Sequence, residues 1–158
     1  MADSIKRTTL IVRDVQKAAQ WYEQVFLMER WLDRPITLTG TGLATGKAGD
    51  ETHLIIMKAN DPVIGMIGLL EWVNPKMDAP PVPTRVEFGA PIFVVGSSDA
   101  KRACEAARKL GSQIYQDPYE WDIVGADGVK KYMIGVSFFD LDGYFYEVNE
   151  VTRTEASE

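Results

Sequence analysis

Two glutamates, Glu71 and Glu147, stand out because each interrupts a segment that is otherwise apolar, residues 67–73 and 144–148. Both segments are rich in aliphatic or aromatic residues and are predicted to be strands. A carboxylate on the inner face of a sheet must be paired, protonated or turned toward a wet pocket, because burying it bare costs several kcal/mol. A desolvated carboxylate in a pocket can act as a general base, so both glutamates are candidate catalytic residues.

Together with water, the same two carboxylates could hold Mg²⁺ or Mn²⁺ only weakly. The sequence contains one cysteine, Cys104, which excludes an internal disulfide and a metal cage built from several cysteines. We therefore predict no tightly bound metal and no other cofactor. Weak binding of a divalent cation through Glu71 and Glu147 is the alternative.

Aromatic residues on the expected strands are numerous enough to line an apolar pocket. The predicted substrate-binding residues of this kind are Phe93, Trp121 and Tyr132. Phe93 is expected to share the strand phase of the glutamates, whereas Trp72 is next to Glu71 and points to the other face. Trp121 lies in the polar segment DPYEWDIVGADG, which is predicted to form a loop over the mouth of the pocket.

His53 is the only histidine and falls on a predicted strand, residues 52–58. Two interpretations of its side chain stay open. It either faces solvent or a hydrogen-bond partner, or it points inward as a base and substrate-binding residue of the pocket. Cys104 is predicted to be a small packing residue, because a catalytic thiol normally needs a nearby histidine.

The segments that position these residues occur twice in the same order: strand, helix and three strands. In the first half the predicted elements are residues 8–12, 14–26, 29–38, 52–58 and 64–73. In the second half they are residues 90–95, 98–110, 112–116, 131–139 and 144–148. Four prolines in residues 74–84 exclude a helix interior or a central strand there. We therefore predict one domain, residues 1–158, with modules at about 5–74 and 89–151 and a linker at about 75–88.

The repeat also predicts which residues correspond between the halves. The predicted helix N-caps, Asp14 and Ser98, are 84 residues apart, as are matching positions on the apolar faces of the two helices. In the last strand of each half, Glu71 is aligned with Glu147, which lies 76 residues later. The change of offset is attributed to different loop lengths.

Three segments carry a resemblance to a known family: TTLIVRDVQKAAQWYEQVF, GLLEWVNP and FFDLDGYFYEVNEV. In their order and spacing they resemble the glyoxalase / bleomycin-resistance / extradiol-dioxygenase superfamily, the vicinal oxygen chelate proteins. The resemblance implies an α+β fold of two βαβββ modules that form a cupped, barrel-like mixed sheet with helices outside. It also implies a small organic ligand and a homodimer, in which modules pair within one chain or across two.

The resemblance further implies a site on the first and last strands of each module. The corresponding residues are Arg7, Glu71, Pro91 and Glu147, where metal-binding members carry two glutamates and two nitrogen or amide ligands. Arginine cannot donate a lone pair to a metal and proline has no side-chain ligand, so two of the four ligands are missing. Arg7 is predicted either to neutralise the glutamates in a structural ion pair or to hold a substrate carboxylate or enolate beside them.

The balance of 17 basic and 23 acidic residues gives a net charge of −6, which argues against nucleic acid as a partner. No apolar run approaches the ~20 residues needed to span a bilayer. The N-terminus lacks the apolar core of a signal peptide, so no membrane partner and a cytoplasmic location are expected. The polar residues 152–158 are expected to fray.

Three functions fit these residues. The first is an enzyme that acts on a small oxygenated molecule by proton transfer, of lyase or isomerase type, with Glu147, Glu71 and Arg7 as catalytic residues. The alternative is a non-catalytic binder of small molecules or drugs, similar to the bleomycin-resistance members. The third is a metal-dependent dioxygenase or lyase, against which Arg7 and Pro91 argue.

Overall fold

The structure is a computed structural model that describes residues 2–156. These residues form two compact units. Unit 1 consists of residues 2–23 and 27–81, and unit 2 consists of residues 24–26 and 82–156. Neither helix in the described part of the chain is long and apolar enough to cross a membrane.

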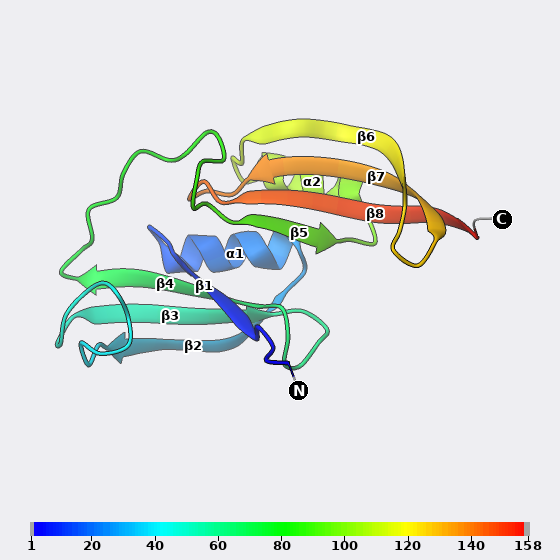
Figure 1. Cartoon of the computed structure of the whole chain (residues 1–158). Helices are drawn as coiled ribbons and strands as arrows, with labels where there is room; N and C mark the ends of the chain where they lie inside the picture. Colours follow the sequence, from blue (N-terminus) through cyan, green and yellow to red (C-terminus); the bar gives the residue numbers. More distant parts are fainter. Residues whose placement is uncertain (1, 157–158) are drawn as a thin grey trace. The chain divides into compact units, whose positions relative to one another are not determined.

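Unit 1 contains one helix and a four-stranded sheet with the strand order β1-β4-β3-β2 (Figure 1). Its elements are β1 (Arg7–Ile11), α1 (Val15–Val25, whose last two residues belong to unit 2), β2 (Glu29–Thr37), β3 (Glu51–Lys58) and β4 (Met66–Asn74). β1 and β4 are parallel, and the other neighbours are antiparallel. The register places Leu10, Leu69 and Ile55 side by side on one face, and all three are buried. Their burial gives the sheet one core-facing side.

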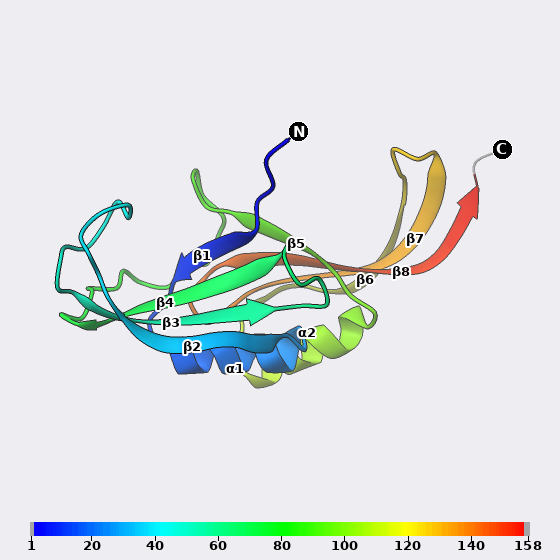
Figure 2. The same cartoon turned by 90° about the horizontal axis from the view of Figure 1, so that it is seen from below.

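Unit 2 repeats this topology with the strand order β5-β8-β7-β6. Its elements are β5 (Ile92–Gly96), α2 (Ala100–Lys109), β6 (Ile114–Val124), β7 (Val129–Phe139) and β8 (Phe145–Ala156). The apolar stripe of α2 consists of small buried residues, Ala100, Ala103, Cys104 and Ala107, and the helix contacts β6, β7 and β8. Figure 2 shows α2 along one side of this sheet, which leaves the other face free of helices. Cys104 is buried there as predicted, and burial raises the pKa of its thiol.

The predicted α+β class with two βαβββ units is confirmed. Residues 75–91 between the two units form neither helix nor strand. Gly111, which follows α2 with a φ of 89°, ends the helix as a glycine with a left-handed backbone typically does.

Three local predictions were wrong. The N-cap of α2 is Asp99, whose side chain accepts a hydrogen bond from the backbone N–H of Arg102, and not Ser98. The segment around Trp121 is not a loop but part of β6, where Pro118 is tolerated because β6 is an edge strand with an irregular register beside the proline. The chain end does not fray through Ala156, since β8 pairs with β7 up to that residue, and residues 157–158 lie outside the described part.

Candidate functional site

The two ladders show which residues correspond between the units. In unit 1, Thr9 of β1 lies opposite Gly68 of β4. In unit 2, Val94 of β5 lies opposite Glu147 of β8. The residue that corresponds to Glu147 is therefore Gly68, and the predicted alignment of Glu71 with Glu147 was wrong. The predicted offset failed because two short apolar strands can be aligned in several ways by sequence alone.

The true counterpart of Glu71 is Glu150. The Glu71 carboxylate accepts a hydrogen bond from the N–H of Val15, the first residue of α1, at 2.8 Å. The Glu150 carboxylate accepts one from the N–H of Ala100, the first residue of α2, at 2.9 Å. The first N–H groups of a helix have no partner within the helix and favour negative charge. Each glutamate thus ties the last strand of its unit to the start of the helix.

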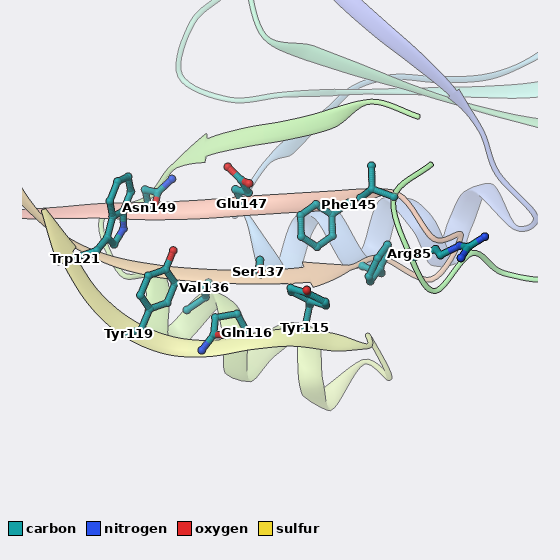
Figure 3. Close-up of a pocket in the computed structure, with 12 residues that line it drawn as sticks. Arg85, Tyr115, Gln116, Tyr119, Trp121, Val136, Ser137, Phe145, Glu147 and Asn149 are labelled. Atoms are coloured by element: carbon teal, nitrogen blue, oxygen red, sulfur yellow. The ribbon is translucent and has the colours of Figure 1, made fainter. Parts of the chain in front are cut away.

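Glu147 has a different environment, on the helix-free face of unit 2. Its neighbours in sequence, Tyr146 and Val148, are buried at 1% and 0% exposure on the opposite face, whereas Glu147 is exposed. Its carboxylate forms no hydrogen bond or ion pair with any residue in the described part of the chain. It projects into a cavity of about 700 Å³ (Figure 3). We call this cavity the trough; its lining residues are Arg85, Val86, Tyr115, Gln116, Tyr119, Trp121, Val136, Ser137, Phe139, Phe145, Glu147 and Asn149.

The strand register arranges most of these side chains in three rows across the sheet. The aromatic row consists of Phe145, Phe139 and Tyr115. The polar row consists of Glu147, Ser137 and Gln116. The mixed row consists of Asn149, Gly135 and Tyr119, with Trp121 beyond it. Within the aromatic row, the ring of Phe145 lies 4.9 Å from that of Phe139 and 5.8 Å from that of Tyr115.

Gly135 makes room for the aromatic side chains at the far end of the trough. A Cβ atom at this glycine would lie 2.9 Å from both the Trp121 Nε1 and the Tyr119 Cε1 atoms. The two rings therefore pack directly on the backbone of β7, as an aromatic side chain does when it covers a glycine in a sheet. The Trp121 indole N–H is buried there and has no hydrogen-bond partner among the described residues. Trp121 lines the trough from a strand, not from the predicted loop.

Arg7 and Glu71 are not brought together within unit 1. Arg7 pairs with Met66, and Glu71 lies five residues further along β4, roughly 16 Å away at the rise of a strand. The Arg7 side chain instead lies over Gly68, with its Cδ 3.3 Å from the place where a Cβ would be. Arg7 is exposed and forms no ion pair with a residue in the described range. The predicted structural ion pair between Arg7 and Glu71 was therefore wrong.

His53 lies in unit 1 and takes the first of its two predicted roles. Its Nε2 atom is 2.6 Å from an oxygen of Asp33, which also accepts a hydrogen bond from Arg30 at 2.9 Å. The hydrogen bond to His53 and then that to Arg30 hold the pKa of Asp33 below its usual value. His53 is the register partner of Glu71 and so shares its face of the sheet.

Phe93 and Tyr132 do not line the trough. Phe93 pairs with Tyr146 and stacks on its ring at 5.2 Å, on the face opposite to Glu147, so its predicted strand phase was wrong. The Tyr132 hydroxyl donates to Glu155 at 2.9 Å, and the Arg153 guanidinium lies 3.9 Å from the centre of its ring. Tyr132 is thus part of a polar cluster near the end of the β7–β8 hairpin.

Several trough residues escaped the sequence analysis. Strand alternation predicts that Phe145 and Asn149 lie on the same face as Glu147, and the structure confirms it, although neither was named as a substrate-binding residue. Tyr119 gave no such signal, because it lies in a segment of β6 with polar composition and a proline that was predicted to be a loop. Nothing in the sequence around Ser137 and Gly135 indicates a binding site, and only their pairing with β8 places them in the trough.

The donor set of the trough does not fit a divalent metal. Among residues 2–156 there is no group of three or more His, Cys, Asp and Glu side chains suited to hold one. Glu147 is flanked in the ladder by Val94 and Ser137, and its counterpart in unit 1 is Gly68. One carboxylate with neutral oxygens is a poor ligand set for Mg²⁺ or Mn²⁺.

Comparisons with known proteins agree with this fold. A glyoxalase family protein from Bacillus cereus matches with a TM-score of 0.74 and 13% identity over 96% of this chain and 95% of its own. The fosfomycin resistance protein FosX from Mesorhizobium loti matches with a TM-score of 0.54 and 17% identity, over 94% of this chain and 91% of its own.

FosX from Listeria monocytogenes, in a complex with Mn(II) and 1S,2S-dihydroxypropylphosphonic acid, matches with a TM-score of 0.52 and 17% identity over 94% of this chain and 90% of its own. At these identities the matches show a shared fold. A search of curated proteins by sequence found no significant match. The family model of the Glyoxalase/Bleomycin resistance protein/Dioxygenase superfamily matches residues 4–148, and the chain belongs to this superfamily.

Proposed function

We propose that unit 2 binds a small organic molecule in the trough, with Glu147 as its polar anchor. The observation that carries the proposal is an exposed carboxylate without a partner among the described residues, on the face of a sheet lined by five aromatic side chains. Cavities of a few hundred Å³ with mostly apolar walls and a few placed polar groups are typical ligand sites. Such a carboxylate is free to accept hydrogen bonds from a ligand.

A proton-transfer enzyme of lyase or isomerase type is the second candidate. It is favoured by the position of Glu147 next to Ser137 in the polar row, where a carboxylate could remove a proton from a bound carbon acid. Glu71 is engaged by the start of α1, so in this proposal Glu147 alone is the base. Catalytic roles for Glu71 and Arg7, a homodimer and a cytoplasmic location stay predictions.

A phosphonic acid of the kind bound by the Listeria protein suits this trough less well. Its negative charge would lie beside Glu147, and like charges repel. The one cation that lines the trough, Arg85, is paired with Glu87, with its Nε donating to that carboxylate at 2.7 Å. Figure 3 shows the Arg85 side chain at the end of the trough and turned away from Glu147. We therefore expect other ligands.

Trp121 provides a direct test, because its indole ring lines the trough. We expect small aromatic compounds that bind there to change the intrinsic tryptophan fluorescence in a saturable way. In the Trp121→Phe variant the remaining three tryptophans should report little change, while binding measured by calorimetry persists. Failure of a chemically diverse set of aromatic compounds to bind at millimolar concentration would overturn the proposal. Turnover of a bound compound that is lost in Glu147→Gln would favour the enzyme over the binder.

A further inference from the structure

We propose that the ligand of the trough carries a positively charged nitrogen with an aromatic or apolar group on each side. This inference rests on the proposed function and adds the chemical class of the ligand. It is carried by the order of the three rows, by the charges of the lining residues and by the hydrogen-bonding groups that remain free in the polar row.

The order of the rows is aromatic, polar and then partly aromatic. Phe145, Glu147 and Asn149 alternate along β8, so the polar row lies midway between the two others. The outer rows are four residues apart, roughly 13 Å at the rise of a strand. Figure 3 shows the same sequence across the trough, with Tyr115 and Phe145 toward one end, Glu147 in the middle, and Tyr119 and Trp121 toward the other. A ligand that fills the trough therefore meets rings at both ends and polar groups at its centre.

The charge of the trough is negative at its centre. Glu147 forms no ion pair with a described residue, whereas Arg85 is paired with Glu87 at 2.6 Å. The face of an aromatic ring also attracts cations, and Tyr115, Tyr119 and Trp121 supply such rings. A cation would thus meet favourable electrostatics both at Glu147 and at the flanking rings, whereas an anion would meet neither.

The polar row offers acceptors. The Gln116 side-chain N–H₂ donates to the backbone carbonyl of Asp117 at 3.1 Å, which leaves the amide oxygen of Gln116 available. The carboxylate of Glu147 accepts only, and the hydroxyl of Ser137 can accept as well. An ammonium group with two N–H donors can be satisfied by these acceptors. An ether oxygen can accept a hydrogen bond from the Ser137 hydroxyl or from the second N–H of Gln116, but it carries no positive charge to pair with the Glu147 carboxylate.

The test uses two probes of nearly equal shape, bis(2-phenylethyl)ammonium and bis(2-phenylethyl) ether, and one larger anionic probe, bis(2-phenylethyl) phosphate. Binding to the full chain is measured by calorimetry at pH 7 and low ionic strength. We expect the ammonium compound to bind most tightly. In Glu147→Gln its affinity should fall about 10- to 100-fold, as expected for loss of a charge-assisted hydrogen bond, while the affinity of the ether changes little.

Glu120→Gln is the matched control, because it removes the same charge from a residue that lies between Tyr119 and Trp121 on β6 but does not line the trough. It should leave the preference for the ammonium compound unchanged. If the ether or the phosphate binds as tightly as the ammonium compound, or if Glu147→Gln leaves the ammonium affinity unchanged, the inference is wrong and the trough still binds small molecules. If none of the three probes binds, and the wider set of aromatic compounds fails too, the proposed function itself fails.

Discussion

In each unit, the turn that joins the last two strands contains an aspartate whose carboxylate accepts backbone hydrogen bonds. The pKa of this aspartate is lowered in unit 1 and raised in unit 2. In unit 1, the Asp61 carboxylate accepts hydrogen bonds from the N–H groups of Val63 and Ile64 at 2.8 and 2.7 Å. In unit 2, the Asp140 carboxylate accepts from the N–H groups of Asp142 and Tyr144, both at 2.9 Å. Asp140 also accepts from the Tyr146 hydroxyl at 3.0 Å.

Burial decides the difference between these two aspartates. Asp61 is exposed, and its backbone hydrogen bonds hold its pKa below the usual value. Asp140 is 7% exposed, and burial raises its pKa to about 7 although its hydrogen bonds act in the opposite direction. The nearby carboxylate of Asp142 adds to the increase. The hydrogen bonds stabilise the charge of both carboxylates, but at Asp140 the cost of desolvation outweighs them.

The largest expected effect concerns Asp140→Asn. The pKa of Asp140 is raised from 3.8 to about 7 in the folded state, so its contribution to stability is fully present below pH 3.8 and is lost as the pH rises to about 7. The upper limit of this loss is about 4 kcal/mol. An asparagine keeps an acceptor for the turn and does not titrate, so the difference in unfolding free energy between the variant and the wild type should shift in favour of the variant between pH 4.5 and 7. Urea unfolding at several pH values measures it.

Asp61→Asn sharpens the comparison. Because the pKa of Asp61 is lowered, its contribution is present above pH 3.8 and lost as the pH falls below that value. The variant should therefore lose stability relative to the wild type at neutral pH, with no advantage gained between pH 4.5 and 7. If the unfolding free energies of the wild type and of Asp140→Asn changed by the same amount between pH 4.5 and 7, the conclusion that burial raises the pKa of Asp140 would be wrong.

The repeat of five elements in each half could be predicted from the sequence because it depends on apolar periodicity, which is present in both helices and in most strands. In β6 only the first residues carry it, and the rest of that strand was predicted to be a loop. The register of the repeat could not be predicted. Glu71 and Glu147 both sit in short apolar strands, and only the ladders with β1 and β5 show that they differ by three positions. The same limit explains Phe93, since a shift of one residue moves a side chain to the other face.

The candidate site was predicted in part for a similar reason. Glu147 and Trp121 were found because a charge in an apolar run and a tryptophan in a polar run are conspicuous. Tyr115, Ser137 and Gln116 join them through pairing between distant strands, which no local pattern encodes. A long-range ladder must exist before these residues can be recognised as neighbours.

In the structure Glu71 corresponds to Glu150, whereas the sequence analysis aligned it with Glu147, and the stability of glutamate variants distinguishes the two alignments. Glu71→Ala and Glu150→Ala should each destabilise the protein by about 1–3 kcal/mol, because each removes a charged acceptor from the start of a helix. Glu147→Ala should change stability by less than about 0.5 kcal/mol, because this carboxylate is exposed and has no partner in the described part of the chain. The midpoints of urea unfolding of the three variants measure these losses of stability. Equal losses for Glu71→Ala and Glu147→Ala would favour the alignment of Glu71 with Glu147.

The smallest effect concerns the N-caps of the two helices. Asp14 directly precedes α1, and its carboxylate accepts hydrogen bonds from the N–H groups of Gln16 and Lys17 in the first turn. Asp99 directly precedes α2, and its carboxylate accepts a hydrogen bond from the N–H of Arg102. Asp14→Ala and Asp99→Ala should each cost about 1 kcal/mol, the usual loss on removing an N-cap. Ser98→Ala should cost less than half of that, because Ser98 is exposed and is not the cap. Thermal unfolding of the three variants ranks them, and a Ser98→Ala loss as large as that of Asp99→Ala would show that α2 begins one residue earlier in solution.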